Sequence, residues 1–201
     1  MALKYATNTS LSAITALPSA VPTDNLILIS TQTASNSASL SFTGINGTYD
    51  MYEFKFINIQ PRTDGDNFEF NFSTDSGSNY NVTKTTTFFE SYHNESDSDA
   101  GLQYQTGYDL AQSTSFQKLS LLVGGASDEN ACGTLQLFNP SSTTYVKHFI
   151  STFNNSSYND YNLNDCMAGY CNTTSAVNAV RFKCQIGNFD GTIKMYGVKK
   201  S

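Results

Sequence analysis

The sequence FEFNF at residues 68–72 indicates the fold class of this chain. Phe68, Phe70 and Phe72 alternate with Glu69 and Asn71, and this is the cleanest alternation in the sequence. Successive side chains of a β-strand point to opposite faces, so the pattern predicts a strand with one apolar face.

The same alternation recurs on both sides of this stretch. A short apolar run occupies residues 26–30. Within residues 52–59, the apolar side chains move to the other face of the strand at Ile57 and Ile59, which predicts a β-bulge. The segment 145–153 has apolar residues on both faces, which predicts a central strand. We expect strands over residues 38–42, 52–59, 68–72, 82–89, 116–123, 134–138, 145–153, 167–171, 176–186 and 192–198.

Composition supports an all-β fold. Phe and Tyr are abundant, with 14 and 12 residues, and the strong helix formers never accumulate in one window. Because loops rather than helices join the expected strands, the sequence predicts an antiparallel two-sheet β-sandwich, jelly-roll-like, over residues 26–201. Residues 1–25 are rich in Ala, Ser and Thr, contain two prolines and predict an extended N-terminal arm.

Turn residues divide the strands. We expect loops at residues 61–67, 93–101 and 154–164, from their content of Pro, Gly, Asn and Asp. Residues 103–114 fit a short helix and an irregular strand equally well.

Charge limits the classes of partner. The net charge is −6 and the pI is about 4.7, which disfavours binding to nucleic acid or to an anionic membrane, because both need clustered Lys and Arg. No run of 18 or more apolar residues predicts a membrane span, and the first 17 residues lack the apolar core of a signal peptide. We expect synthesis in the cytoplasm and no membrane insertion.

Candidate site residues are few. The chain has two histidines; His148 lies inside an expected strand, where a packed or cross-strand role is typical, and His93 precedes an acidic loop. Serines are too numerous to indicate a catalytic triad, and no nucleophile-elbow motif is present. Glu95, Asp97 and Asp99 could offer oxygens to Ca²⁺, but the ligand order of an EF-hand is absent. A solvated loop is the better interpretation, also for Asp64-Gly65-Asp66 and Asp128-Glu129-Asn130.

Four cysteines complete the search: Cys132, Cys166, Cys171 and Cys184. Free thiols are typical of a chain made in a reducing compartment, and a Cys166–Cys171 disulfide remains an alternative. No short-spaced pair of ligands predicts zinc. The sequence therefore assigns no catalytic, cofactor-binding or metal-binding residue, and it predicts a protein that is not an enzyme.

Four segments together resemble a known class of proteins: LISTQTAS at residues 28–35, FKFINIQP at 54–61, FNPSSTTYVK at 138–147 and GNFDGTIKMYG at 187–197. The sequence between residues 26 and 198 is similar to uncharacterised virion-associated proteins of marine tailed bacteriophages, such as those that infect cyanobacteria. The resemblance carries no catalytic motif. It implies a structural protein on the virion surface, in a tail fibre or tail tip that attaches to the host.

Two alternatives stay open. One is a capsid decoration (cement) protein that stabilises the phage head, and the other is a carbohydrate-active enzyme with dispersed carboxylates. For the virion role we expect a homotrimer, anchored to other virion proteins through residues 1–25. Its exposed loops would contact a host-surface polysaccharide or protein, for which many Tyr and Asn side chains are suited.

Overall fold

The computed structural model describes residues 26–198, so the predicted arm at residues 1–25 lies outside the described residues. Within that range the chain forms strands, turns and loops and no helix. The strands are β1 (Leu26–Ser37), β2 (Leu40–Thr43), β3 (Met51–Pro61), β4 (Asp66–Ser73), β5 (Lys84–Asn94), β6 (Ala100–Tyr104), β7 (Gln117–Val123), β8 (Ala131–Phe138), β9 (His148–Ser156), β10 (Tyr161–Cys171), β11 (Ala179–Cys184) and β12 (Phe189–Val198).

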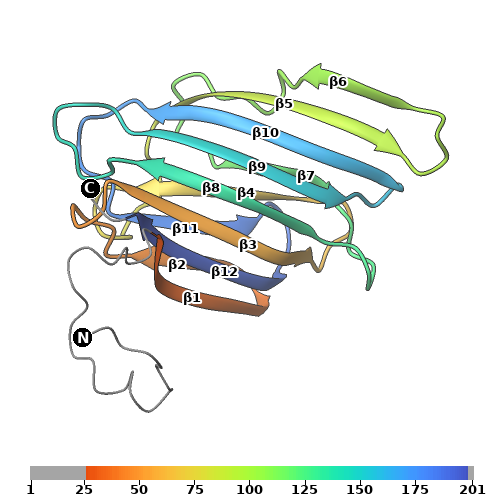
Figure 1. The fold of residues 1–201 in the computed structure, drawn as a ribbon, viewed down its shortest axis with the longest axis horizontal. Helices are drawn as coiled ribbons and strands as arrows, with labels where there is room; N and C mark the ends of the chain where they lie inside the picture. Colours follow the sequence, from red (N-terminus) through yellow and green to blue (C-terminus); the bar gives the residue numbers. More distant parts are fainter. Residues whose placement is uncertain (1–25, 199–201) are drawn as a thin grey trace, which may run out of the picture.

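Two antiparallel sheets make the predicted β-sandwich. The large sheet has eight strands in the order β1-β12-β3-β8-β9-β10-β5-β6, and the small sheet has four in the order β2-β11-β4-β7. Figure 1 shows them as two layers, with β4, β7 and β11 behind the large sheet. The small sheet has half as many strands as the large sheet, and no other strand between residues 26 and 198 packs on the outer face of the large sheet.

Aromatic rings fill the space between the layers. The predicted strand at residues 68–72 is β4, and its three phenylalanines are fully buried. Phe182 on β11 lies at the centre of the cluster, with its ring centroid 4.9 Å from that of Phe56 and 5.3 Å from that of Phe54. Edge-to-face packing of this kind adds to the free energy gained by burying the rings. The core of the sandwich is therefore a phenylalanine cluster shared by both sheets.

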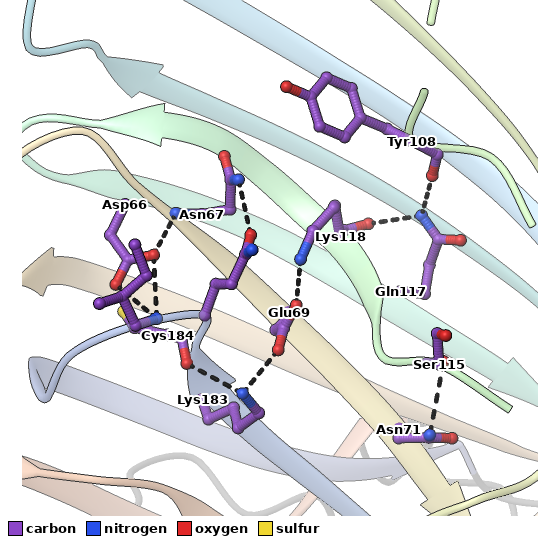
Figure 2. A network of polar contacts seen from close by, with 12 residues as sticks. Asp66, Asn67, Glu69, Asn71, Tyr108, Ser115, Gln117, Lys118, Lys183 and Cys184 are labelled. Atoms are coloured by element: carbon purple, nitrogen blue, oxygen red, sulfur yellow. Dashed lines mark hydrogen bonds and ion pairs between the residues drawn. The ribbon is translucent and has the colours of Figure 1, made fainter. Parts of the chain in front are cut away.

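The polar residues of the FEFNF stretch are also buried. Glu69 lies between Lys118 and Lys183 on the neighbouring strands β7 and β11, with Lys183 Nζ 2.7 Å from Glu69 Oε1 (Figure 2). Asn71 donates from Nδ2 to the carbonyl oxygen of Thr114 at 2.8 Å. Both polar side chains thus link β4 to its surroundings instead of facing free solvent.

Several expectations on single elements are confirmed. The predicted bulge is present, because the pairing of β3 with β8 shifts between Phe56 and Ile59. The strand expected at residues 145–153 is β9 and lies between β8 and β10, well inside the large sheet. However, exposed and buried residues alternate strictly along β9. Only one face of the strand is therefore buried, although both faces carry apolar residues.

Two predicted loops are shorter than expected. The segment 93–101 is the turn of a hairpin in which His93 pairs with Ala100, and the segment 154–164 is a tight hairpin between β9 and β10. Their polar residues belong to strands because the backbone N–H and C=O groups pair with the neighbouring strand, and this pairing does not depend on the polarity of the side chains. The ambiguous segment 103–114 contains the end of β6 followed by turns, and no helix.

Candidate functional site

The outward side chains of β8, β9, β10, β5 and β6 form one continuous surface, which we call the neutral face. Pairing between these strands aligns outward residues in rows that cross the sheet. One such row consists of Thr134, Thr152, Cys166, Phe89 and Tyr104.

Charge distribution distinguishes the neutral face. None of the outward positions of these five strands, all within the described residues, holds Asp, Glu, Lys or Arg. The charged residues that the five strands do contain, Lys84, Glu90 and Asp165, point inward and are buried. Charged side chains are almost never fully buried unless paired, and soluble proteins normally place them outside. The neutral face therefore reverses the usual arrangement.

The adjoining strands β3 and β12 carry charged residues on the outer face. Glu53 and Lys55 on β3 form an ion pair, and Lys55 lies over the ring of Tyr196 on β12. Lys194 is the cross-strand neighbour of Lys55. These two strands separate the five strands of the neutral face from the edge strand β1, which has no charged residue.

A polar hollow of about 420 Å³ lies at one end of the neutral face. His93, Cys132, Asn154 and Asn162 line it from four different strands. Asn154 donates from Nδ2 to Asn162 Oδ1 at 2.7 Å and to the carbonyl oxygen of Leu163 at 3.0 Å. These bonds fix the orientation of both amides. The hollow therefore presents preorganised amide groups to solvent, with the carboxylate of Glu95 from the turn after β5 at its rim.

An apolar hollow of about 400 Å³ lies farther along the same strands. The small side chain of Ala168 lies between taller neighbours: Thr87 on β5, and His148, Ile150 and Tyr170. The rings of His148 and Tyr170 are cross-strand neighbours with centroids 6.0 Å apart. This end of the neutral face offers carbon and ring surfaces rather than amides.

Behind the neutral face, Asp165 is held in a buried polar cluster. Its Oδ2 accepts hydrogen bonds from Ser120 Oγ and from the backbone N–H of Leu121, both at 3.0 Å. Its Oδ1 is buried without a hydrogen-bond partner, and Glu90 is the cross-strand neighbour. Burial is the main cause that raises the pKa of Asp165 to about 8, and the charge of Glu90 adds to it. A protonated Asp165 can donate a hydrogen bond to the carboxylate of Glu90, its cross-strand neighbour.

Lys84 is a second ionisable side chain buried behind the neutral face. Its Nζ donates to Asn71 Oδ1 at 2.6 Å and to the carbonyl oxygen of Val82 at 2.9 Å. Burial lowers the pKa of this amine to about 7, an effect that nearby Cys171 opposes. Lys84 therefore ties β5 to β4 through neutral acceptors.

The two histidines singled out in the sequence both lie on the neutral face. His148 has the expected cross-strand role, beside Tyr170, but is exposed. His93 Nε2 lies 3.2 Å from Asp97 Oδ1. No local pattern indicates that these side chains share a surface, because they come from strands separated by β10.

The acidic loops do not converge on a cation. Asp97 faces His93, whereas Asp99 accepts a hydrogen bond from the hydroxyl of Tyr161 at 3.0 Å. Asp64 accepts from the backbone N–H of Gly125, and Glu129 from that of Ala126. Among the described residues there is no group of three or more His, Cys, Asp or Glu side chains that could hold a metal ion.

The four cysteines are free. Cys166 and Cys171 are five residues apart on β10, so they point to opposite faces of the sheet, Cys166 outward and Cys171 into the core. The alternative of a Cys166–Cys171 disulfide is therefore wrong. None of the described residues belongs to a helix long and apolar enough to cross a membrane.

Comparison with known proteins gives little beyond the fold. No protein-family model matches the chain, and no curated protein matches it. Among solved structures, a galectin of Caenorhabditis elegans is similar at 7% sequence identity and a TM-score of 0.35, over 83% of this chain and 95% of the galectin. At that TM-score the similarity supports no conclusion on function.

Proposed function

We propose that this protein is a non-enzymatic host-adhesion module on the surface of a bacteriophage particle, and that its neutral face binds a host saccharide. The observation that carries the binding role is the absence of charged side chains from the outward positions of β8, β9, β10, β5 and β6. The particle role rests on the resemblance of four sequence segments to phage virion proteins.

A neutral saccharide fits this surface chemically. Its hydroxyl groups pair with amides and hydroxyls such as those of Asn154, Asn162 and Thr152, and its C–H faces pack on rings such as Tyr170. Fixed charges on the binding surface would have to be desolvated without a counter-charge on such a ligand, at a cost in affinity.

The one pair of carboxyl groups directly behind the neutral face is not placed for hydrolysis at that face. Glu90 and Asp165 are paired across β5 and β10, but both are buried on the inner side of the sheet. A glycosidase needs two carboxyl groups on either side of a bound substrate. The paired carboxyls therefore give no support to the carbohydrate-active enzyme alternative.

A pair of matched variants tests the binding surface. Thr152 on β9 and Thr31 on β1 are both exposed and belong to the same outward row, four strands apart, about 19 Å at normal strand spacing. We expect Thr152→Glu to abolish binding on an array of neutral glycans, whereas Thr31→Glu should bind like the wild type. If both variants bind equally, or if the wild type binds no glycan, the proposal is wrong.

Antibody labelling of purified phage particles, viewed by electron microscopy, tests the particle role. Label on tail tips or fibres would support host adhesion. Label spread over the head would contradict adhesion and favour the capsid-decoration alternative. Absence of label from intact particles would contradict a virion-surface location altogether.

A further inference from the structure

We infer that the neutral face binds a linear oligosaccharide lengthwise along β9 and β10, with one sugar over Ala168 in the apolar hollow and another against Asn154 and Asn162 in the polar hollow. This inference rests on the proposed saccharide binding and adds the length and direction of the ligand. It is carried by two hollows of nearly equal size on the same pair of strands.

The two hollows are too far apart for one sugar. Ile150 lines the apolar hollow and Asn154 the polar one, and they are four residues apart on β9, which corresponds to roughly 13 Å at the rise of an antiparallel strand. Both side chains point outward, since Ile150, Thr152 and Asn154 are exposed and their neighbours are buried. A ligand that fills both hollows must therefore be a chain of several sugar units.

The surface between the hollows permits such a chain to pass. Thr152 and Cys166 are cross-strand partners there, and both side chains are short and uncharged. Phe89 on β5, the next member of this row, lies beside Cys166 and flanks the line between the hollows. A chain running along the strands would thus meet hydroxyl and thiol groups midway.

The apolar and polar hollows offer contacts for different parts of a sugar unit. Over Ala168, the rings of His148 and Tyr170 offer surface for the C–H face of a pyranose. At the other end, the hydrogen bond between Asn154 and Asn162 leaves Asn154 Oδ1 and Asn162 Nδ2 unused in that pairing, as an acceptor and a donor for hydroxyl groups. Because both amides are already oriented, little further ordering is needed on binding.

Chain length is the decisive variable in the test. The full-length protein is titrated with cello-, malto-, laminari- and manno-oligosaccharides, each from the monosaccharide to the hexasaccharide. For the series that binds, we expect the affinity to rise at least tenfold between the disaccharide and the hexasaccharide, because only the longer chains reach both hollows.

Two substitutions at exposed positions test the apolar hollow. Ala168→Leu fills this hollow, and we expect it to abolish the gain with chain length while short fragments still bind. Thr31→Leu adds a leucine to the outer face on β1, outside both hollows, and should bind as the wild type. Since residues 31 and 168 are both exposed, both variants should keep the wild-type circular dichroism spectrum and melting temperature.

The other outcomes are distinguishable. If binding does not depend on chain length and survives Ala168→Leu but is lost in Thr152→Glu, saccharide binding stands and the lengthwise mode is wrong. If no oligosaccharide of any length binds, the proposed function fails and the lengthwise mode with it.

Discussion

Burial of single ionisable residues gives this protein a pH-dependent stability. Asp165 has a pKa of about 8 in the folded chain, against an ordinary value of 3.8. The folded state therefore holds a proton that the unfolded state has already released, and this contribution to stability is lost as the pH rises from about 4 to about 8.

Asp165→Asn removes this titration while keeping the shape of the side chain. We expect the wild type to lose stability relative to the variant as the pH rises from 5 to 9, by on the order of a few kcal/mol. Urea unfolding of both proteins at several pH values measures the difference. Parallel stability curves would show that Asp165 does not carry the proton.

For Lys84 we expect the opposite change of stability with pH. Its pKa of about 7 lies below the ordinary value of 10.5, so the unfolded state binds a proton that the folded state lacks, and stability is lower at pH 6 than at pH 10. At pH 10, Lys84→Met should destabilise the fold by about 1–3 kcal/mol, because Asn71 Oδ1 and the carbonyl of Val82 lose their donor.

The loss of stability caused by Lys84→Met should be smaller at pH 6, because protonation of the buried amine already destabilises the folded wild type at that pH. The same urea titrations measure it. A cost that grows at low pH would contradict a buried amine with a lowered pKa.

Among the strands, β11 contributes Phe182, whose ring contacts phenylalanines of both sheets. Phe182 packs against Phe42, Phe54, Phe56, Phe68 and Phe70. We expect Phe182→Ala to lower the free energy of unfolding by about 3–5 kcal/mol. Phe89→Ala is the matched control, because Phe89 is 44% exposed on the neutral face, and it should cost well under half as much. Equal losses would contradict the central role of Phe182.

Close packing between β8 and β9 depends on a glycine. A Cβ at Gly133 would lie 2.5 Å from Phe153 Cγ and 2.6 Å from the carbonyl oxygen of Thr152, so Gly133→Ala should cost about 1–3 kcal/mol. Gly107 has nothing within 4 Å of such a Cβ, and Gly107→Ala should leave the melting temperature nearly unchanged. Thermal denaturation of the two variants makes the comparison.

At the scale of the whole molecule, residues 26–198 contain both sheets and the complete aromatic core. We therefore expect a chain that lacks residues 1–25 to fold with an unchanged melting temperature. If those residues anchor the protein to other virion proteins, the truncated chain should fail to enter phage particles. Normal incorporation would contradict the anchoring role.

Oligomeric state is a second property of the whole molecule. Among the described strands, β1 and β6 are the edges of the large sheet, and closed symmetric assembly is one way to cover such edges. For the trimer proposed from the virion role, sedimentation equilibrium should give three times the 22.0 kDa of the chain. A monomer at all concentrations would contradict it.

The sequence by itself determined the class of fold and the approximate positions of most strands. Alternation in FEFNF and the change of phase at Ile57 and Ile59 are local signals, because strand geometry places neighbouring side chains on opposite faces wherever the chain is extended. Hairpins with polar strands have the sequence pattern of loops, because backbone hydrogen bonds leave no trace in hydrophobicity.

The tertiary structure alone decided the candidate site. The neutral face exists because β8, β9, β10, β5 and β6 are neighbours, although β5 and β8 are far apart in sequence. Likewise, Glu90 meets Asp165 only through the register of β5 and β10. Pairing between distant strands depends on the global packing of the two sheets, and no local period encodes it. Therefore the sequence indicated strands and polar residues, but only the fold showed which of them share a surface.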